Sequence, residues 1–183
     1  MQRKFLKKLL GSVETFFPEL KVMYMDESFF KTTTSLTHTW GDREQRKVVK
    51  VTSNQGSLTV IGAIDPKVGD HDEWIYDVAN SRTVNSFLWQ LSARYSDVQI
   101  LLVMDNASFH RSQGSEGYPI PENINILFQP PYSPDLNYQE VVWKISKDSY
   151  FKNRLCKSFE ELSQTVEEIF RDLKDHRFIF DVH

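Results

Sequence analysis

Hydrophobic and polar residues follow one another along the chain in two kinds of pattern, which predict strands and helices. Short apolar runs predict strands, and the most apolar of them, residues 98–105, is typical of a central strand buried on both faces. The predicted strands are residues 21–26, 57–64, 73–78, 98–105 and 123–128. Apolar residues repeated every three or four positions predict helices. The predicted helices are residues 1–17, 83–95, about 134–150 and about 158–174. This order predicts a mixed α/β domain with one central sheet flanked by helices.

The last two predicted helices carry sequence signals for where they start. Ser133-Pro134-Asp135 places a capping hydroxyl, a proline suited to the first helical position and an acid near the positive helix end. Ser158 is followed three residues later by Glu161, which is the spacing of a capping box. We therefore expect one helix to begin at Pro134 and the other after Ser158.

Composition limits the class of protein. The chain has 183 residues, of which 40% are hydrophobic and 26% charged, so it is long enough and apolar enough for one globular domain. The single cysteine, Cys156, excludes an internal disulfide framework and a cysteine-built zinc site. No apolar run reaches membrane-spanning length, and the basic N-terminus is too interrupted for a signal peptide. We expect an intracellular, soluble chain, cytoplasmic or associated with the nucleoid.

The net charge of −3 argues against a dedicated nucleic-acid-binding module, because such modules are usually basic. The charge is unevenly distributed, however, and a basic stripe lies between residues 144 and 157. Its members are Lys144, Lys147, Lys152, Arg154 and Lys157. Such a stripe suits contact with phosphates, although a solvated surface explains it equally well.

Three carboxylates stand out by their position. Asp26 and Asp105 each come at the end of a predicted strand, and Glu140 is expected about two turns into the helix after a proline-rich loop. Strand ends lie at the rim of a sheet, where α/β proteins usually build their sites. Acids gathered there repel one another unless a cation lies between them, and Mg²⁺ is the natural cation for oxygen ligands. Two such ions can serve phosphoryl transfer.

Each acid taken alone also has a purely structural explanation. Asp26 can cap a turn with Glu27 and Ser28, and Asp105 can form a turn with Asn106. Glu140 can pair with Lys144 four residues later on the helix surface. The three acids together favour a site, but they do not identify a reaction.

The sequence motifs around these acids are more specific. They are YMDES (24–28), VMDNASFH (103–110) and PPYSPDLNYQEVVWKISK (130–147), with 34 residues between Asp105 and Glu140. This pattern resembles the catalytic domain of DDE-type transposases, in the mariner-like superfamily and its bacterial insertion-sequence relatives. Thr39-Trp40-Gly41 and Ile61-Gly62-Ala63 also look like that family's words. The sequence departs from the family at Tyr138 and Gln139, where proline and an aliphatic residue are usual.

The resemblance implies a ribonuclease-H-like fold and metal-dependent DNA strand cleavage and strand transfer at transposon ends. It implies that Asp26, Asp105 and Glu140 hold Mg²⁺, with two ions expected and Mn²⁺ able to substitute. A catalytically inactive remnant, kept as a DNA-binding or assembly module, is the alternative function. A structure-specific nuclease on the same fold is a third, against which the words at 130–140 argue.

Other residues are weighed beside the acids. Asn106 is a candidate to orient Asp105 or to form a turn. His110 is a candidate to align the site or to contact phosphate, and a structural role is its third explanation. Trp143 is expected in the core. Lys144, Lys147, Lys152 and Arg154 are candidates for contact with DNA phosphates.

Partners and domain limits follow from the same resemblance. The expected partner is double-stranded DNA, as transposon ends and target. Family members carry helix-turn-helix modules before the catalytic domain, so a separate module or polypeptide is expected here, and a homodimer is possible. We expect a helical or linker segment at 1–20, the catalytic domain at 21–175 and a C-terminal tail at 176–183.

Overall fold

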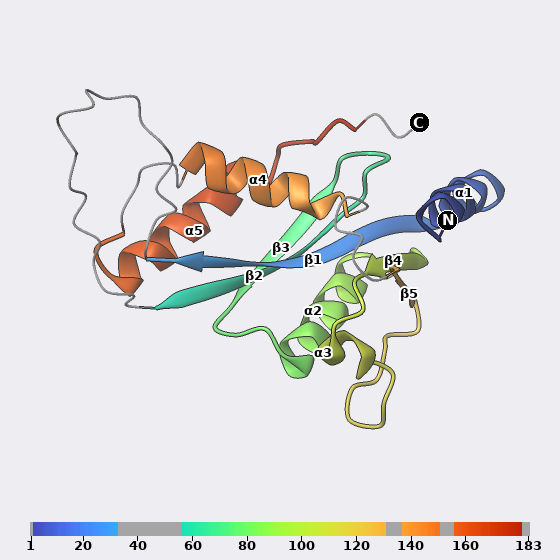
Figure 1. Ribbon diagram of the computed structural model, residues 1–183, viewed down its shortest axis with the longest axis horizontal. Helices are drawn as coiled ribbons and strands as arrows, with labels where there is room; N and C mark the ends of the chain where they lie inside the picture. Colours follow the sequence, from blue (N-terminus) through green and yellow to red (C-terminus); the bar gives the residue numbers. More distant parts are fainter. Residues whose placement is uncertain (1, 33–55, 131–136, 151–155, 181–183) are drawn as a thin grey trace.

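The computed structural model describes residues 2–32, 56–130, 137–150 and 156–180 of the chain. Five strands and five helices lie within these residues (Figure 1). In chain order they are α1 (Gln2–Phe16), β1 (Lys21–Lys31), β2 (Ser57–Ile64), β3 (His71–Tyr76), α2 (Ser81–Arg94), β4 (Ile100–Met104), α3 (Ser108–Arg111), β5 (Ile124–Phe128), α4 (Gln139–Tyr150) and α5 (Phe159–Leu173). The prediction of a mixed α/β domain is confirmed, and each predicted strand is present, 57–64 with its predicted bounds and the others with ends shifted by a few residues.

The five strands form one mixed sheet in the order β3-β2-β1-β4-β5. β1, β2 and β3 pair antiparallel, whereas β1, β4 and β5 pair parallel. β1 therefore stands at the centre and joins an antiparallel half to a parallel half. Its neighbour β4 is the most apolar predicted strand, and its position inside the sheet agrees with burial on both faces.

The prediction that the first strand ends at Asp26 is wrong, because β1 continues for five more residues to Lys31. Its parallel pairing with β4 is recorded up to Tyr24↔Val103, but its antiparallel pairing with β2 runs on to Lys31↔Ser57. The pair of β1 and β2 keeps the backbone hydrogen bonds of this polar stretch satisfied, so the strand does not need apolar residues to continue. Asp26 thus marks the end of the parallel half of the sheet and not the end of β1.

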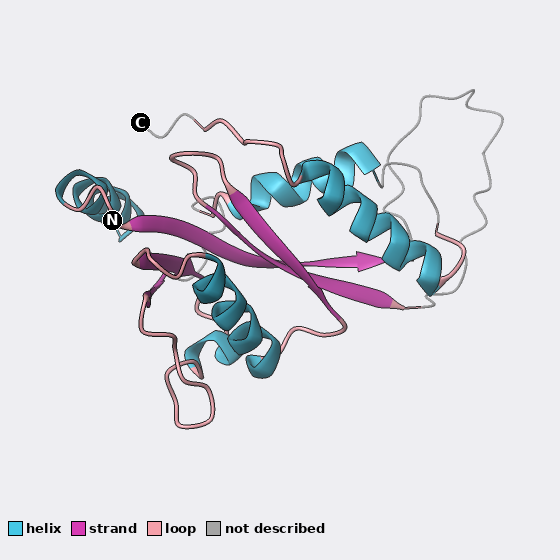
Figure 2. Ribbon diagram, turned by 180° about the vertical axis from the view of Figure 1, so that it is seen from behind, coloured by secondary structure: helices cyan, strands magenta, loops and turns pink. Residues whose placement is uncertain are grey.

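Helices cover both faces of the sheet (Figure 2). Alternate residues of each strand point to opposite faces, which produces two hydrophobic clusters. On one face, α4 and α5 pack through Val142, Trp143 and Ile169 against strand residues such as Tyr24. On the other face, α2 packs against a second set of strand residues that includes Met23 and Leu102. α1 lies at the end of the molecule where β1 begins (Figure 1).

The helices largely begin where local chemistry places them. Ser158 accepts a hydrogen bond from the backbone N–H of Glu161, which confirms the predicted start of α5. α2 begins two residues before its predicted start, behind a capping box formed by Asn80 and Thr83. The short helix α3 was not predicted. Its four residues are too few to produce an apolar period.

The prediction that the next helix begins at Pro134 is wrong, since Asn137 and Tyr138 are not helical and α4 begins at Gln139. The Asn137 side chain explains the later start. Its oxygen accepts the backbone N–H of Gln139 at 3.1 Å, and its amide donates to the carbonyl of Met25 on β1 at 2.8 Å. The word Ser133-Pro134-Asp135 lies outside the described residues, as does Thr39-Trp40-Gly41.

Residues after α5 also contact the fold. Phe178 is buried in the same cluster as α4 and α5, and its N–H donates to the carbonyl of Gly69. Gly69 has a φ of +77°, and an added Cβ would meet the backbone of Phe178, so only glycine suits this close approach. Among the described residues, no helix combines the length and apolar character needed to cross a membrane.

Candidate functional site

Continuing the sheet register past the recorded pairs predicts that the first two acids lie close together. The parallel pairing of β1 with β4 matches Tyr24 to Val103, and the same offset extended by two residues matches Asp26 to Asp105. Residues at matched positions of adjacent parallel strands lie side by side. Asp105 follows the last residue of β4, so it lies at the carboxyl end of the parallel half of the sheet.

Asp26 lies between the sheet and α4. Its Oδ2 accepts a hydrogen bond of 3.0 Å from the indole Nε1 of Trp143, a residue that is only 2% exposed. Trp143 is in the core, as expected, but it also orients a carboxylate. Burial raises the pKa of Asp26 to about 7, and the negative charges of Glu27 and Glu140 add to that effect. An isolated Asp26 carboxylate is therefore costly here, and a nearby cation would remove the cost.

Glu140 lies at the start of α4. It is the second residue of the helix, so the expectation that it lies about two turns in is wrong. The later start at Gln139, fixed by Asn137, accounts for the difference. Glu140 is exposed, and its charge acts on Asp26, which places the two acids near each other. Asn137 anchors this end of α4 to Met25, the residue before Asp26.

Asp105 is held from its other side. Its Oδ1 accepts the backbone N–H of Ala107 at 2.9 Å and Nδ1 of His110 at 2.6 Å. His110 is fully buried, and its Nε2 lies 2.6 Å from Oε1 of Glu27. Both ring nitrogens are thus engaged, and the ring is not open to a phosphate in this structure. The hydrogen bond from His110 lowers the pKa of Asp105.

The charge state of His110 follows from its two neighbours. Burial by itself lowers the pKa of His110, but the hydrogen bonds to Asp105 and Glu27 outweigh burial and raise that pKa to about 10. The ring therefore carries a proton on each nitrogen at neutral pH and donates to both carboxylates. Glu27 was not singled out from the sequence. Its partner lies 83 residues away, so no local pattern could reveal the contact.

The oxygen-only donor set of Asp26, Asp105 and Glu140 is suited to Mg²⁺. Within the described parts of the chain, no three His, Cys, Asp or Glu side chains already converge closely enough to hold a metal ion. The negative charge of Glu140 helps to raise the pKa of Asp26, whereas Asp105 is hydrogen-bonded to His110. Mutual repulsion is expected to keep such acids apart without a cation, so their convergence on one ion stays a prediction.

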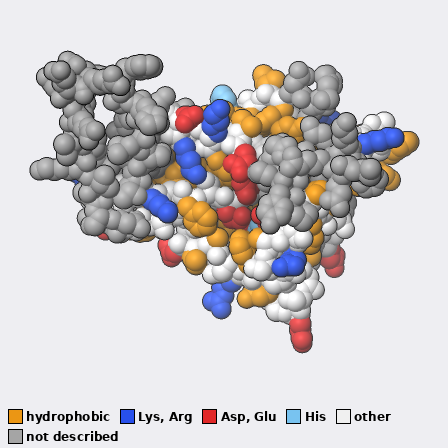
Figure 3. Space-filling model, in the orientation of Figure 1, with side chains coloured by type: hydrophobic (Ala, Val, Ile, Leu, Met, Phe, Trp, Pro, Cys, Tyr) orange, Lys and Arg blue, Asp and Glu red, His pale blue; other side chains and the backbone are white. Residues whose placement is uncertain are grey.

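The candidate DNA-contacting lysines are only partly placed. Lys144 is exposed on α4, and Lys147 lies over the ring of Phe30 with its Nζ 5.5 Å from the ring centre. Burial lowers the pKa of Lys147, while the charges of Glu140 and Asp26 act in the opposite direction. Figure 3 shows acidic and basic side chains lying close together over α4 and the strands behind it. Lys152 and Arg154 lie outside the described residues, and Asn106 is exposed beside Asp105.

A buried polar layer lies beneath Glu140, and the sequence did not reveal it. Gln139 is fully buried, and its Nε2 approaches Oε1 of Glu73 at 3.4 Å. Gly62 makes room for this contact, because a Cβ there would collide with Gln139 and would lie 2.8 Å from the ring of Trp143. Gly62 pairs with Asp26 on one side and with Glu73 on the other. The unusual Gln139 thus links the helix of Glu140 to the edge strand.

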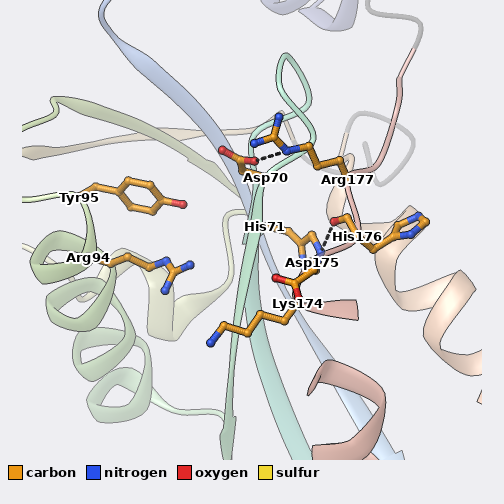
Figure 4. A pocket seen from close by; sticks show the side chains of 8 residues that line it. All are labelled: Asp70, His71, Arg94, Tyr95, Lys174, Asp175, His176 and Arg177. Carbon is orange, nitrogen blue, oxygen red and sulfur yellow. Dashed lines mark hydrogen bonds and ion pairs between the residues drawn. The ribbon is translucent and has the colours of Figure 1, made fainter. Parts of the chain in front are cut away.

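A second polar region lies at the start of β3 (Figure 4). It is a cavity of about 590 Å³ lined by Asp70, His71, Arg94, Tyr95, Lys174, Asp175, His176 and Arg177. Acidic and basic groups are mixed there, and Arg177 approaches Asp70 at 3.4 Å. None of the predicted site residues lines it. Its mixed charges give no preference for an anion or a cation.

The sequence of the chain matches the model of one protein family, described as DDE superfamily endonuclease, over residues 21–163. The chain belongs to this family. The match includes β1, β4 and the start of α4, which carry the three acids.

Two curated relatives of this DDE-family chain are proteins of mobile elements. A 39 kDa protein of insertion element IS630 from Shigella sonnei is 27% identical over 151 residues, which cover 81% of this chain and 44% of that protein. The Tc3 transposase of Caenorhabditis elegans is 27% identical over 166 residues, which cover 86% of this chain and 50% of that protein. The chain therefore spans about half the length of these two relatives.

Solved structures give the same fold for the DDE-family chain. A pre-cleavage Mos1 transpososome matches 93% of this chain and 54% of that protein, with a TM-score of 0.69 and 16% identity. The catalytic domain of Mos1 mariner transposase matches 92% of this chain and 79% of that domain, with a TM-score of 0.60 and 14% identity. The ribonuclease-H-like fold implied by the resemblance is confirmed.

Proposed function

We propose that this chain is the catalytic domain of a DDE-type transposase, which cuts DNA at transposon ends and joins the ends to a target. One observation carries the proposal. The recorded pairing of β1 with β4 ends at Tyr24 and Val103, and continuing its offset by two residues sets Asp26 beside Asp105, with Glu140 at the second position of α4. Membership of the DDE endonuclease family and the transposase relatives support it.

The residues proposed to hold the metal are Asp26, Asp105 and Glu140, with two Mg²⁺ ions expected and Mn²⁺ as a substitute. Solved Mos1 paired-end complexes are described with Mg and with Mn, which supports this choice. The pKa of Asp26, raised first by its burial, supports this choice, because a nearby cation would stabilise the charged carboxylate. When bound, the metal neutralises charge and acts as a Lewis acid at the reacting phosphodiester.

The chain's own residues position the reaction. In the first step water attacks a phosphodiester and breaks its P–O3′ bond, which leaves a 3′-hydroxyl on one side of the break and a 5′-phosphate on the other side of the same strand. In the second step that 3′-hydroxyl oxygen bonds to a target phosphorus, and the displaced 3′-oxygen of the target takes up a proton. Trp143 orients Asp26, and Asn137 anchors the start of α4, the helix of Glu140, to β1. Most of the rate gain in such a site comes from positioning and charge neutralisation.

DNA is the proposed substrate, and its phosphates are the proposed partners of Lys144 and Lys147, together with Lys152 and Arg154. Phosphate contacts carry no sequence information, so these residues provide affinity without specificity. We propose that the reading of transposon ends is done by a helix-turn-helix module outside residues 21–175, on this polypeptide or another one. A homodimer that joins two ends is part of the same proposal, as is action on DNA inside the cell.

The decisive test replaces Asp105 by Asn. The swap keeps the shape but removes the charge proposed to hold the metal, so Mg²⁺-dependent cleavage of a DNA duplex should fall by more than about 100-fold. The thermal unfolding transition should stay intact, because the side chain is about half exposed. The measurement is a gel assay of strand cleavage in Mg²⁺ and in Mn²⁺.

The matched control is Asp97→Asn, an exposed aspartate after α2. It should cleave like the wild-type chain. Cleavage by Asp105→Asn at the wild-type rate would contradict the assignment. A wild-type chain that binds DNA but never cuts it would support the inactive alternative.

A further inference from the structure

We propose that Glu27 and His110 are positioning residues for Asp105. Glu27 holds the His110 ring, the ring fixes one carboxylate oxygen of Asp105, and the other oxygen is left for the metal. The inference rests on the proposed function, because it assigns these residues a role toward the proposed metal site. It deepens that proposal by adding Glu27, an acid that is not one of the proposed metal ligands.

The first step of the argument is the alternation of side chains along β1. Asp26 and Glu27 are neighbours in the strand, so they point to opposite faces of the sheet. Asp26 meets Trp143 of α4, whereas Glu27 meets His110 of α3 on the other face. Two adjacent residues of β1 therefore serve two of the proposed metal ligands. Asp26 is itself one of them, and Glu27 reaches the other, Asp105, through the ring of His110.

The second step is the burial of the connecting ring. His110 has no exposed surface, and the Glu27 side chain is only 8% exposed. Each ring nitrogen lies 2.6 Å from a carboxylate oxygen, which is the short distance of a charge-assisted hydrogen bond. α3 packs against α2, which keeps the ring from moving away. Such a ring, held on both sides, transmits the position of Glu27 to Asp105.

The third step is the division of labour within the Asp105 carboxylate. Oδ1 accepts both described hydrogen bonds, from Ala107 and from His110. Oδ2 has no donor among the described residues, and the side chain is 56% exposed. A carboxylate fixed through one oxygen keeps its other oxygen pointed to one side, and hydrogen bonds of this kind orient metal ligands in many proteins.

A different role for the same contacts is to hold α3 in place without any effect on the site. The two roles predict different results. If Glu27 and His110 only support the fold, replacing Glu27 lowers the melting temperature and leaves metal affinity unchanged. If they position Asp105, the affinity for a metal probe falls even in a variant that stays folded, because a freely rotating carboxylate must be ordered on binding.

The test titrates the full chain with Mn²⁺ alone and measures free Mn²⁺ by electron paramagnetic resonance. Asp105→Asn should abolish one Mn²⁺ site. Glu27→Gln should raise the Mn²⁺ dissociation constant of that same site by about 10-fold or more. Glu27→Asp keeps the charge and withdraws the carboxylate by one methylene, so it should stay folded and show a smaller rise in the same constant.

The control is Asp65→Asn. Asp65 is buried and pairs with Lys21 at 2.8 Å, at the opposite end of β1. Its replacement should lower the melting temperature and leave Mn²⁺ affinity unchanged.

The outcomes separate this inference from the proposed function. Mn²⁺ affinity that drops in Asp105→Asn but stays at the wild-type value in folded Glu27→Gln and Glu27→Asp would overturn the inference alone. Mn²⁺ binding that ignores Asp26, Asp105 and Glu140 altogether would instead overturn the proposed metal site.

Discussion

Two buried histidines, His110 on α3 and His71 on β3, each contact a glutamate through one ring nitrogen. They differ in what the other ring nitrogen contacts. His110 joins Glu27 to the carboxylate of Asp105. His71 joins Glu73, at 2.8 Å from Nδ1, to the backbone carbonyls of Leu173 and His176 at 3.0 Å from Nε2. Burial lowers the pKa of each ring, and the carboxylate contacts outweigh burial in both, so both pKa values are raised.

The difference teaches that a His–Glu pair has no fixed role. The His71 ring closes the carboxyl end of α5, whose carbonyls have no partner inside the helix, so the pair fastens α5 to the edge of the sheet (Figure 4). The His110 ring ends on a side chain that is half exposed at the proposed site. The first pair therefore serves the fold, and the second is proposed to serve chemistry as well.

The largest effect should come from breaking the His71 pair. His71→Gln leaves the buried side chain of Glu73, which is 5% exposed, without the hydrogen bond to the His71 ring. We expect the free energy of unfolding to fall by about 3 kcal/mol, because removing one partner of a buried hydrogen-bonded pair is strongly destabilising. Urea unfolding measures the loss, and Mn²⁺ affinity of the folded variant should match the wild type. A fall in that affinity would erase the contrast between the two pairs.

A smaller effect should follow from Gly62→Ala, because Gly62 lies between the two regions and pairs with both Asp26 and Glu73. The added methyl group collides with Gln139 and Trp143, so α4 must move away from the sheet. We expect a loss of about 1–3 kcal/mol in unfolding free energy, the usual cost of overpacking. DNA cleavage should fall as well, since Glu140 moves with α4.

Gly11→Ala is the matched control for Gly62→Ala, because no atom lies within 4 Å of a Cβ at that position. It should leave cleavage unchanged. Wild-type cleavage by Gly62→Ala together with the expected loss of stability would show that the position of α4 does not govern the site.

The smallest effect should be a dependence of stability on pH through His71. The pKa of His71 is raised above its ordinary value of 6.5, so the stabilisation is fully present below about pH 6.5 and is lost as pH rises through the folded-state pKa. Asp72, the ring of Phe178 and the two carbonyls also face this histidine. Glu73→Gln removes the group that most raises the pKa, so the advantage of the wild type should shrink with rising pH.

The measurement is the difference in unfolding free energy between the wild type and Glu73→Gln at several pH values. His110 is present in both proteins, so its own contribution cancels in the difference. A difference that stays constant as pH rises, or that grows, would contradict the charged state of the His71 pair.

Sequence patterns predicted which helices and strands form better than they predicted the residues at which these elements begin and end. Strand 57–64 has the predicted bounds, because its apolar residues fill both faces of the sheet. The end of β1 was misplaced, since polar residues such as Asp26 and Glu27 continue a strand when a partner strand satisfies their backbone. The start of α4 was misplaced because Asn137 caps it through a contact that also needs β1. In each case a tertiary contact overrode a local signal.

The candidate site divides in the same way. The three acids were predicted because local words surround each of them, and Trp143 was placed in the core by its neighbours in the helix. Two contacts near the site were not predicted. One joins Glu27 to His110, and the other joins Gln139, the residue before Glu140, to Glu73. These contacts join residues 83 and 66 positions apart, across which a single sequence carries no signal.

The sequence by itself determined the α/β order, the apolar faces of the helices and strands and the three acids of the DDE pattern. These properties depend on local spacing, and local spacing is written in the chain. Only the tertiary structure decided which oxygen of Asp105 is held, that Glu27 and Asp26 serve opposite faces, and that Gly62 allows α4 to approach the sheet. These properties depend on strand register and packing, which bring distant residues within hydrogen-bond range.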